Sequence, residues 1–344
     1  MKKLLTLLFL FSAVTIFSQE NLKGKIIGKD NMPLEGVNVY YDGTTISTIS
    51  DADGKFSIKY EPNANSILVI SSMGYQTEYL SGLDVSKLLN ITMKISENEL
   101  KEVVVNNNQQ FTRAQKLKLF REYFLGKTSN AKSAIIKNED DIKFKYDKKN
   151  LLFTASSDKP LVIINPALGY KIDFELVIFE VSFNRFSINS IDASKNFYGG
   201  VSRFEEIDNS AKVLKKREKT YQGSQIQFFR NLANTDWGAK KFLLFKDKYN
   251  QDPTKCFKIT KEGDFAKVEL IPQDKGETTN LNSKNMVTYN LLFDKKETSR
   301  ISFETDNFYI YKYGNNSNIQ DILFSGKISE KRVGDMLPLN YGIE

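Results

Sequence analysis

The sequence lacks histidine and contains a single cysteine among its 344 residues. Without an imidazole, the chain cannot form a Ser-His-Asp triad, a Cys-His catalytic pair or a histidine-ligated zinc site. A single cysteine also excludes an intramolecular disulfide and a cysteine-rich metal site. We therefore expect no cofactor.

Positive charge is in only slight excess, with 49 Lys and Arg residues against 42 Asp and Glu residues and a net charge of +7. Lys2 and Lys3 lie in a segment that we expect to be removed, which lowers the charge from +7 to +5. The remaining bases are mostly lysines mixed with acidic residues, whereas nucleic-acid-binding proteins cluster basic residues on one face. We expect a mixed, solvated surface and no nucleic-acid partner.

The first 18 residues have the features of a signal peptide. A short basic start precedes the apolar run from Leu4 to Phe17, and Ser18 offers a small residue for cleavage before Gln19. A transmembrane helix needs about 20 apolar residues, and no later segment reaches that length. No cysteine follows the run, so lipoprotein anchoring is not expected. We predict an exported protein in the periplasm or associated with the outer membrane, with no transmembrane segment after cleavage.

Residues 19–105 show short strand patterns separated by turn residues. The expected strands cover 22–28, 37–41, 46–49, 56–60, 66–71, 76–80, 89–95 and 103–105. So many short strands without a helical pattern predict a β-sandwich.

Three segments of this region carry a family resemblance: GKIIGKDNMPLEGVNVYYDGTTISTISDADGKFSIKY, ISSMGYQTEYL and ELKEVVV. They resemble the carboxypeptidase-regulatory-like domain over residues 22–105. That resemblance implies a transthyretin-like antiparallel β-sandwich, found in many exported proteins of Gram-negative bacteria and at the N-terminus of TonB-dependent receptors. It implies no carboxypeptidase activity, because the catalytic domain of those enzymes needs histidine ligands.

Asp51 and Asp53 begin a sequence, Asp-Ala-Asp-Gly, that can also begin a calcium loop. The fifth and twelfth positions of such a loop need oxygen ligands, but Lys55 and Pro62 stand there. A hairpin turn with Gly54 at positive φ accounts for the same residues. We therefore predict a turn and no metal site.

Polar residues 106–111 form the expected linker to a second domain, residues 112–344. Thr112 and Gln115 have the spacing of a capping box, and apolar residues that follow at helical intervals predict a helix ending before Gly126. Beyond it, strands are expected at 142–146, 151–155, 161–165, 170–174, 177–183, 242–245, 256–260, 266–270, 286–293, 298–303, 307–313 and 322–328. The predicted fold class is therefore mainly β: the sandwich followed by a β-rich α+β domain with a few helices.

Ser224 and Gln227 predict the start of a second helix within this domain. The basic run 215–219 before it is either the polar end of an earlier helix or a loop, and a run of this length could attract an acidic surface. Segments 160–176, 197–207, 216–232 and 332–341 resemble the C-terminal region of other exported proteins that carry the same sandwich. That second resemblance brings no functional residues with it.

A histidine-free hydrolase in the second domain is an alternative function. Glu205 and Glu206, with Asp208 nearby, offer carboxylates, but adjacent strand residues point to opposite faces and would not converge. We interpret them as exposed acids next to Arg203. A Ser-Lys pair would need Ser224, whose side chain the helix cap already uses.

Cys256 is expected to be a buried, reduced thiol within a strand, because an exposed single cysteine in an oxidising compartment would form intermolecular disulfides. Trp237, the only tryptophan, is expected to pack on the core. Many Tyr and Phe residues suit contact with a polysaccharide or a peptide strand as well as they suit a β core.

The leading hypothesis is a non-enzymatic, exported cell-envelope protein that serves as a binding, scaffold or assembly module, with no catalytic residues. Its expected partner is a cell-envelope protein or polysaccharide. The first alternative is the hydrolase, and the second is an accessory component of a TonB-dependent uptake system.

Overall fold

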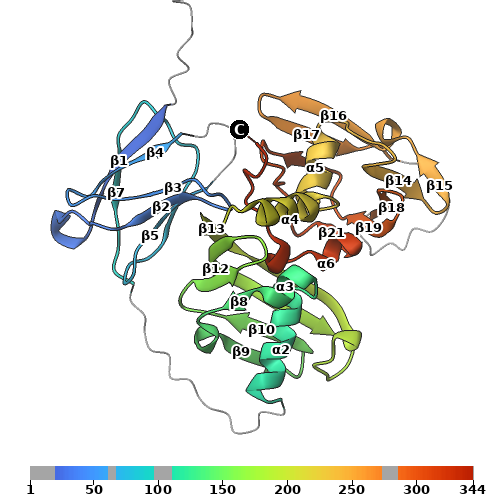
Figure 1. Ribbon diagram of the computed structural model, residues 1–344, viewed down its shortest axis with the longest axis horizontal. Helices are drawn as coiled ribbons and strands as arrows, with labels where there is room; N and C mark the ends of the chain where they lie inside the picture. Colours follow the sequence, from blue (N-terminus) through green and yellow to red (C-terminus); the bar gives the residue numbers. More distant parts are fainter. Residues whose placement is uncertain (1–19, 61–66, 97–110, 273–285, 344) are drawn as a thin grey trace, which may run out of the picture.

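The computed structural model describes residues 20–60, 67–96, 111–272 and 286–343 (Figure 1). The predicted signal peptide 1–18, most of the linker 106–111 and the expected strand 103–105 lie outside these residues. The molecule is mainly β, as predicted, and nearly all of its strand pairs are antiparallel.

The N-terminal sandwich consists of two small sheets. Its strands are β1 (Asn21–Ile27), β2 (Asn38–Tyr41), β3 (Ser47–Ile49), β4 (Lys55–Lys59), β5 (Leu68–Ser71), β6 (Glu78–Leu80) and β7 (Leu89–Thr92). One sheet has the order β4-β1-β7 and the other β3-β2-β5-β6. β1 and β7 pair in parallel, which departs from the antiparallel prediction. β4 shows why the segment folds as it does, since its alternating apolar residues Phe56 and Ile58 are buried between the sheets.

A central sheet has the order β8-β11-β12-β10-β9, with β13 on the other side of β12. Its strands are β8 (Ile135–Ile136), β9 (Lys143–Asp147), β10 (Leu152–Ser156), β11 (Leu161–Asn165), β12 (Tyr170–Phe183) and β13 (Ala193–Glu206). β10 and β11 share one edge of β12, end to end. The two strands predicted at 170–174 and 177–183 are therefore one long strand, because a bulge against β13 near Leu176 lets it continue.

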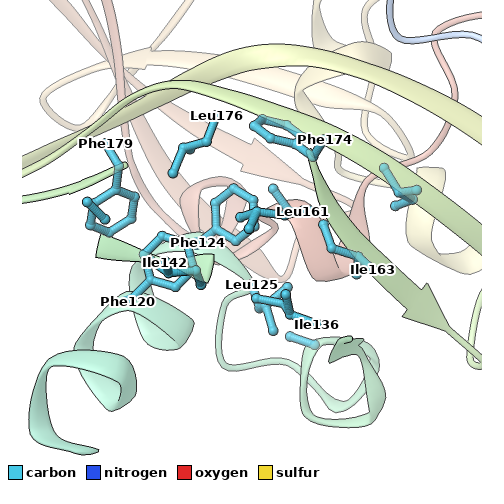
Figure 2. Close-up of a cluster of buried hydrophobic side chains, with 14 of the residues drawn as sticks. Phe120, Phe124, Leu125, Ile136, Ile142, Leu161, Ile163, Phe174, Leu176 and Phe179 are labelled. Atoms are coloured by element: carbon cyan, nitrogen blue, oxygen red, sulfur yellow. The ribbon is translucent and has the colours of Figure 1, made fainter. Parts of the chain in front are cut away.

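Helix α2 (Arg113–Phe124) packs its aromatic stripe on this sheet, followed by α3 (Ser129–Ser133). The predicted capping box is present: Thr112 Oγ1 accepts from the Gln115 N–H, and Gln115 Oε1 accepts from the Thr112 N–H. Figure 2 shows Phe120 and Phe124 pointing into the core toward Phe174 and Phe179. Full burial of each aromatic ring contributes about 2–3 kcal/mol, so α2 is held by packing more than by its sequence propensity.

The C-terminal part has two further sheets, with orders β15-β14-β18-β19-β21 and β16-β17-β20. Their strands are β14 (Phe242–Lys246), β15 (Tyr249–Gln251), β16 (Phe257–Glu262), β17 (Phe265–Leu270), β18 (Val287–Phe293), β19 (Glu297–Phe303), β20 (Asn307–Ile310) and β21 (Ile322–Gly326). Helices α4 (Ala211–Tyr221), α5 (Gln225–Ala233) and α6 (Lys327–Glu330) complete the α-helices of the described residues. The strand predicted at 322–328 stops at Gly326, whose φ of 79° turns the chain into α6.

Candidate functional site at the domain junction

The loop after β2 joins the sandwich to the edge of the central sheet at β13. The Gly43 N–H donates to the Ser202 carbonyl at 2.7 Å, and the Phe204 N–H donates to the Thr44 carbonyl at 3.1 Å. Thr44 and Arg203 thereby form a short parallel bridge. Because these bonds join backbones, the loop satisfies donors and acceptors that an exposed sheet edge would leave open.

Polar side chains add two links between the same units. Arg203 on β13 bonds the Asp173 carboxylate on β12, and its Nη1 donates to Asn38 Oδ1 on β2 at 2.7 Å. The Tyr79 hydroxyl on β6 donates to Glu175 Oε1 at 2.6 Å. Arg203, singled out in the sequence only as the neighbour of two acids, thus connects the domains.

The last residues of the chain close the junction from a third side. We call residues 327–343 the C-terminal clasp. The Leu339 N–H donates to the Gly43 carbonyl at 2.6 Å, and Asn340 exchanges hydrogen bonds with Thr45. Arg230 on α5 donates to the carbonyls of Leu339 and Tyr341. The clasp therefore ties the sandwich to the C-terminal sheets.

Burial at this junction shifts the ionisation of Asp42. Its Oδ1 accepts from the Ser202 N–H at 2.7 Å. Loss of water raises the pKa of the Asp42 carboxyl from 3.8 to about 6, although the backbone N–H groups of Ser202 and Gly43 oppose the shift. Burial likewise raises the pKa of the Tyr40 hydroxyl, which lies near Asp42, Glu175 and Arg203.

We predict that the protein loses stability as the pH rises through the pKa of Asp42. Since the folded-state pKa exceeds the unfolded one, the protonated carboxyl stabilises the fold fully below about pH 4, and this contribution is lost by about pH 6. A shift of about two units corresponds to about 3 kcal/mol. Urea unfolding between pH 4 and 7 should show this fall, and Asp42→Asn should remove it. If the free energies of unfolding of the wild type and of Asp42→Asn changed with pH in the same way, the pH dependence would not come from Asp42.

A cleft of about 500 Å³ opens beside the clasp, between the end of α2, the β12–β13 loop and α6. Its lining residues are Glu122, Tyr123, Gly126, Lys127, Ser190, Ile191, Glu330 and Arg332. Both carboxylates already pair with cations, Glu122 with Lys127 and Glu330 with Lys327. Arg332 donates to the Tyr123 carbonyl at 2.7 Å. With its charges engaged in this way, the cleft is suited to binding a polar group rather than to acid–base chemistry.

The sequence Asp-Ala-Asp-Gly at residues 51–54, which could also begin a calcium loop, forms a turn. Asp51 Oδ1 accepts from the N–H groups of Asp53 and Lys55, and Asp53 pairs with the Lys55 ammonium. Gly54 has a φ of 73°, and a Cβ there would lie 2.3 Å from the Ile26 carbonyl oxygen. The turn joins β3 and β4, which belong to different sheets, so it forms a corner of the sandwich and not the predicted hairpin.

The carboxylates considered as catalytic groups of a hydrolase, those of Glu205, Glu206 and Asp208, do not form a common site. Glu205 pairs with Lys171 at 2.9 Å, whereas Glu206 pairs with Arg217 at 3.3 Å. Asp208 accepts from the Ser210 N–H. The three carboxylates are thus held by different partners.

The predicted second helix begins at its cap as expected, with one difference. Ser224 Oγ accepts from the Gln227 N–H at 3.1 Å. The side-chain carbonyl oxygen of Gln227, however, accepts from the Gly223 N–H and not from that of Ser224, because Gly223 turns the chain at a φ of 68°. Ser224 is therefore engaged in capping α5.

Cys256 is buried, with 1% of its surface exposed, and lies one residue before β16 instead of inside it. Burial raises the pKa of its thiol, and a hydrogen bond with Tyr289 partly offsets this shift. Trp237 is partly buried as predicted, its ring parallel to that of Phe257 and edge-on to Phe228.

We expect the Cys256 thiol to react with a maleimide only when the protein opens, because the thiolate is both scarce and inaccessible. Labelling of the native protein should be at least about 100-fold slower than labelling in denaturant. Comparable rates would mean that the Cys256 thiol is accessible in solution.

The family profile of the CarboxypepD_reg-like domain matches residues 22–105. The N-terminal sandwich is a CarboxypepD_reg-like domain. TonB-dependent receptor P39 of Formosa agariphila is 36% identical over 102 residues, which are 29% of this chain and 10% of the receptor. TonB-dependent receptor SusC of Bacteroides thetaiotaomicron is 34% identical over 97 residues, 28% of this chain and 9% of the receptor. This chain therefore spans about a tenth of the length of these relatives.

One solved structure adds a distant likeness to part of the chain. A chain of a type II cohesin–X-dockerin complex from Acetivibrio cellulolyticus is 24% identical, with a TM-score of 0.20, and the match covers 22% of this chain and 57% of that one. So low a score supports no conclusion about this protein.

The junction residues were not predicted as a site. From the sequence, Asp42 and Gly43 are only the turn that ends a strand, and their partner Ser202 is 160 positions away from Asp42. Local periodicity contains no information about such pairing. Within the described residues, no helix is both long enough and apolar enough to cross a membrane.

Proposed function

We propose that this protein is a non-enzymatic cell-envelope module that acts as an accessory component of TonB-dependent uptake. The observation that carries the proposal is the likeness of its sandwich to part of TonB-dependent receptors, together with the firm attachment of that sandwich to a body of three further sheets. The same chemistry that holds the junction together, backbone pairing at a sheet edge, is a common way for extended peptides to bind.

The proposed organisation has a signal peptide at 1–18, the CarboxypepD_reg-like domain at 19–105, a linker at 106–111 and a β-rich domain at 112–344. The protein would be exported and would lie in the periplasm or at the outer membrane without a lipid anchor. In this arrangement the C-terminal domain is the body, and the CarboxypepD_reg-like domain presents its free end to the partner.

Site-specific photo-crosslinking in living cells tests the proposal. A photoreactive residue replaces Met73, which is 96% exposed on the turn between β5 and β6, or Tyr249, which is 77% exposed on β15. Both side chains are exposed, so neither replacement should disturb the fold. We expect crosslinks to an outer-membrane receptor from position 73 and not from position 249.

Two outcomes would contradict the proposal. Recovery of the protein only from the soluble periplasmic fraction, without receptor crosslinks from either position, would exclude an accessory role. Receptor crosslinks from position 249 alone would show that the body, and not the CarboxypepD_reg-like domain, meets the receptor.

A further inference from the structure

The basic run 215–219 singled out in the sequence lies inside α4 (Ala211–Tyr221), an 11-residue helix. Figure 1 shows α4 near the middle of the molecule, where the CarboxypepD_reg-like domain, the central sheet and the C-terminal sheets come together. The helix presents four exposed lysines, which are Lys212, Lys215, Lys216 and Lys219. We call these four residues the lysine face.

The lysine face is confined to one side of the helix. At about 100° per residue, its four positions fall within an arc of about 100°. Val213, Arg217 and Thr220 are buried on a different side. Glu218 is exposed beside the lysines, so the face keeps a large positive excess.

No lysine of this face has an ion-pair partner in the described parts of the chain. Many other lysines do, including Lys171 with Glu205 and Lys241 with Asp236. Four neighbouring cations without counter-charges repel one another, and an anionic surface would relieve that repulsion. Charge complementarity therefore selects an acidic partner.

The helix is also held in a fixed position. Arg217 donates to the carbonyls of Leu168, Gly169 and Asp208, which fastens α4 to the β11–β12 turn and to the loop after β13. Burial of Val213 and Thr220 adds apolar contact. The lysines therefore extend from a rigid support instead of from a mobile loop.

We propose that the lysine face binds the anionic headgroup layer of a phospholipid membrane. A protein partner is disfavoured by the residue types, because protein interfaces are depleted in lysine and depend on Tyr, Trp and Arg anchors. The ammonium group of lysine is a point charge at the end of a flexible side chain. It can therefore bind a layer of lipid phosphates without shape complementarity. The proposal draws its cellular setting from the proposed envelope function, but binding to a bilayer can be measured without any receptor.

The test is sedimentation of the purified full-length protein with vesicles. One set contains phosphatidylcholine alone, and the other adds about one third phosphatidylglycerol. We expect binding only to the anionic vesicles, with strong weakening at about 0.5 M salt, where exposed charges are screened. Since each lysine near such a surface strengthens binding about fivefold, the variant K212Q/K215Q/K216Q/K219Q should bind about two to three orders of magnitude more weakly.

A matched variant, K23Q/K94Q/K118Q/K248Q, removes the same charge from four exposed, unclustered positions. We expect it to bind nearly as well as the wild type, and thermal unfolding should confirm that both variants are folded. Equal loss in the two variants would overturn the proposal, as would absent binding to anionic vesicles. A third outcome would also overturn the proposal: neither the wild type nor either variant binds vesicles, and only the lysine-face variant loses its crosslink to a receptor. The lysine face would then bind a protein and not a membrane.

Discussion

Replacement of Arg217 by methionine is expected to lower the free energy of unfolding by about 3–5 kcal/mol, the range typical of breaking a buried charged network. The guanidinium-bearing side chain is only 3% exposed and donates to three carbonyl groups. It also lies over the Tyr170 ring, with 4.0 Å between the guanidinium carbon and the ring centroid. Methionine would fill much of the space but would remove the donor to the Leu168 and Asp208 carbonyls, whereas the Gly169 carbonyl would keep its bonds from the Ile207 and Asp208 N–H groups.

Urea unfolding of three variants checks this prediction. Lys216→Met, one residue away on the exposed side of the same helix, should change stability by less than about 0.5 kcal/mol. Arg217→Lys should remain strongly destabilised, because an ammonium cannot reproduce the planar fork of donors. If Arg217→Met and Lys216→Met behaved alike, Arg217 would not be a structural anchor of α4.

The basic run shows how far the sequence predicts this fold. Its residues look equally solvated in the sequence, yet Arg217 is buried and Lys215, Lys216 and Lys219 are exposed. The helical period explains the difference only once the helix is known to lie on the β11–β12 turn. The sequence left open whether the run is the end of a helix or a loop, and the β11–β12 turn that covers one face of the helix is distant in the chain.

Strands were predicted well where apolar residues alternate, as in β4, and where they follow one another without a break, as in β11. β13 was not predicted as a long strand, because Gly199 and Gly200 interrupt the pattern and polar residues fill much of it. Gly200 is required there, since a Cβ would lie 2.0 Å from the Glu175 carbonyl oxygen on β12. The residue that weakens the local strand signal thus permits the long pairing that supports the junction.

The junction between the sandwich and the rest of the chain could not be predicted from the sequence for a related reason. Gly43 meets Ser202 on one side and Leu339 on the other, so three segments that are far apart in the chain converge on one turn. Each segment alone resembles an ordinary loop. Their function as a connection between domains is a property of the folded chain and of backbone groups, which all residue types share.

Gly334→Ala is expected to destabilise the protein by about 3 kcal/mol or more, the upper range for overpacking. A Cβ at Gly334 would lie 2.4 Å from the Cα atom of Ala131 and 2.6 Å from the Leu125 carbonyl oxygen. Both are backbone atoms that cannot rotate away. The Gly334 N–H donates to that same carbonyl at 2.9 Å, and its own carbonyl accepts from Asn165 Nδ2. The substitution would therefore push the C-terminal clasp away from α3 and the end of α2.

Thermal unfolding and limited proteolysis measure the effect, with Gly342→Ala as the matched control. Gly342 has a φ of 68°, but a Cβ added there would have no atom within 4 Å, so alanine should cost only about 1 kcal/mol of backbone strain. Because the clasp carries the bond from Leu339 to Gly43, Gly334→Ala should also expose the CarboxypepD_reg-like domain to earlier cleavage from the body. Equal stability of the two variants would show that the clasp can move aside, and that the contacts of the sandwich with β12 and β13 hold the junction without it.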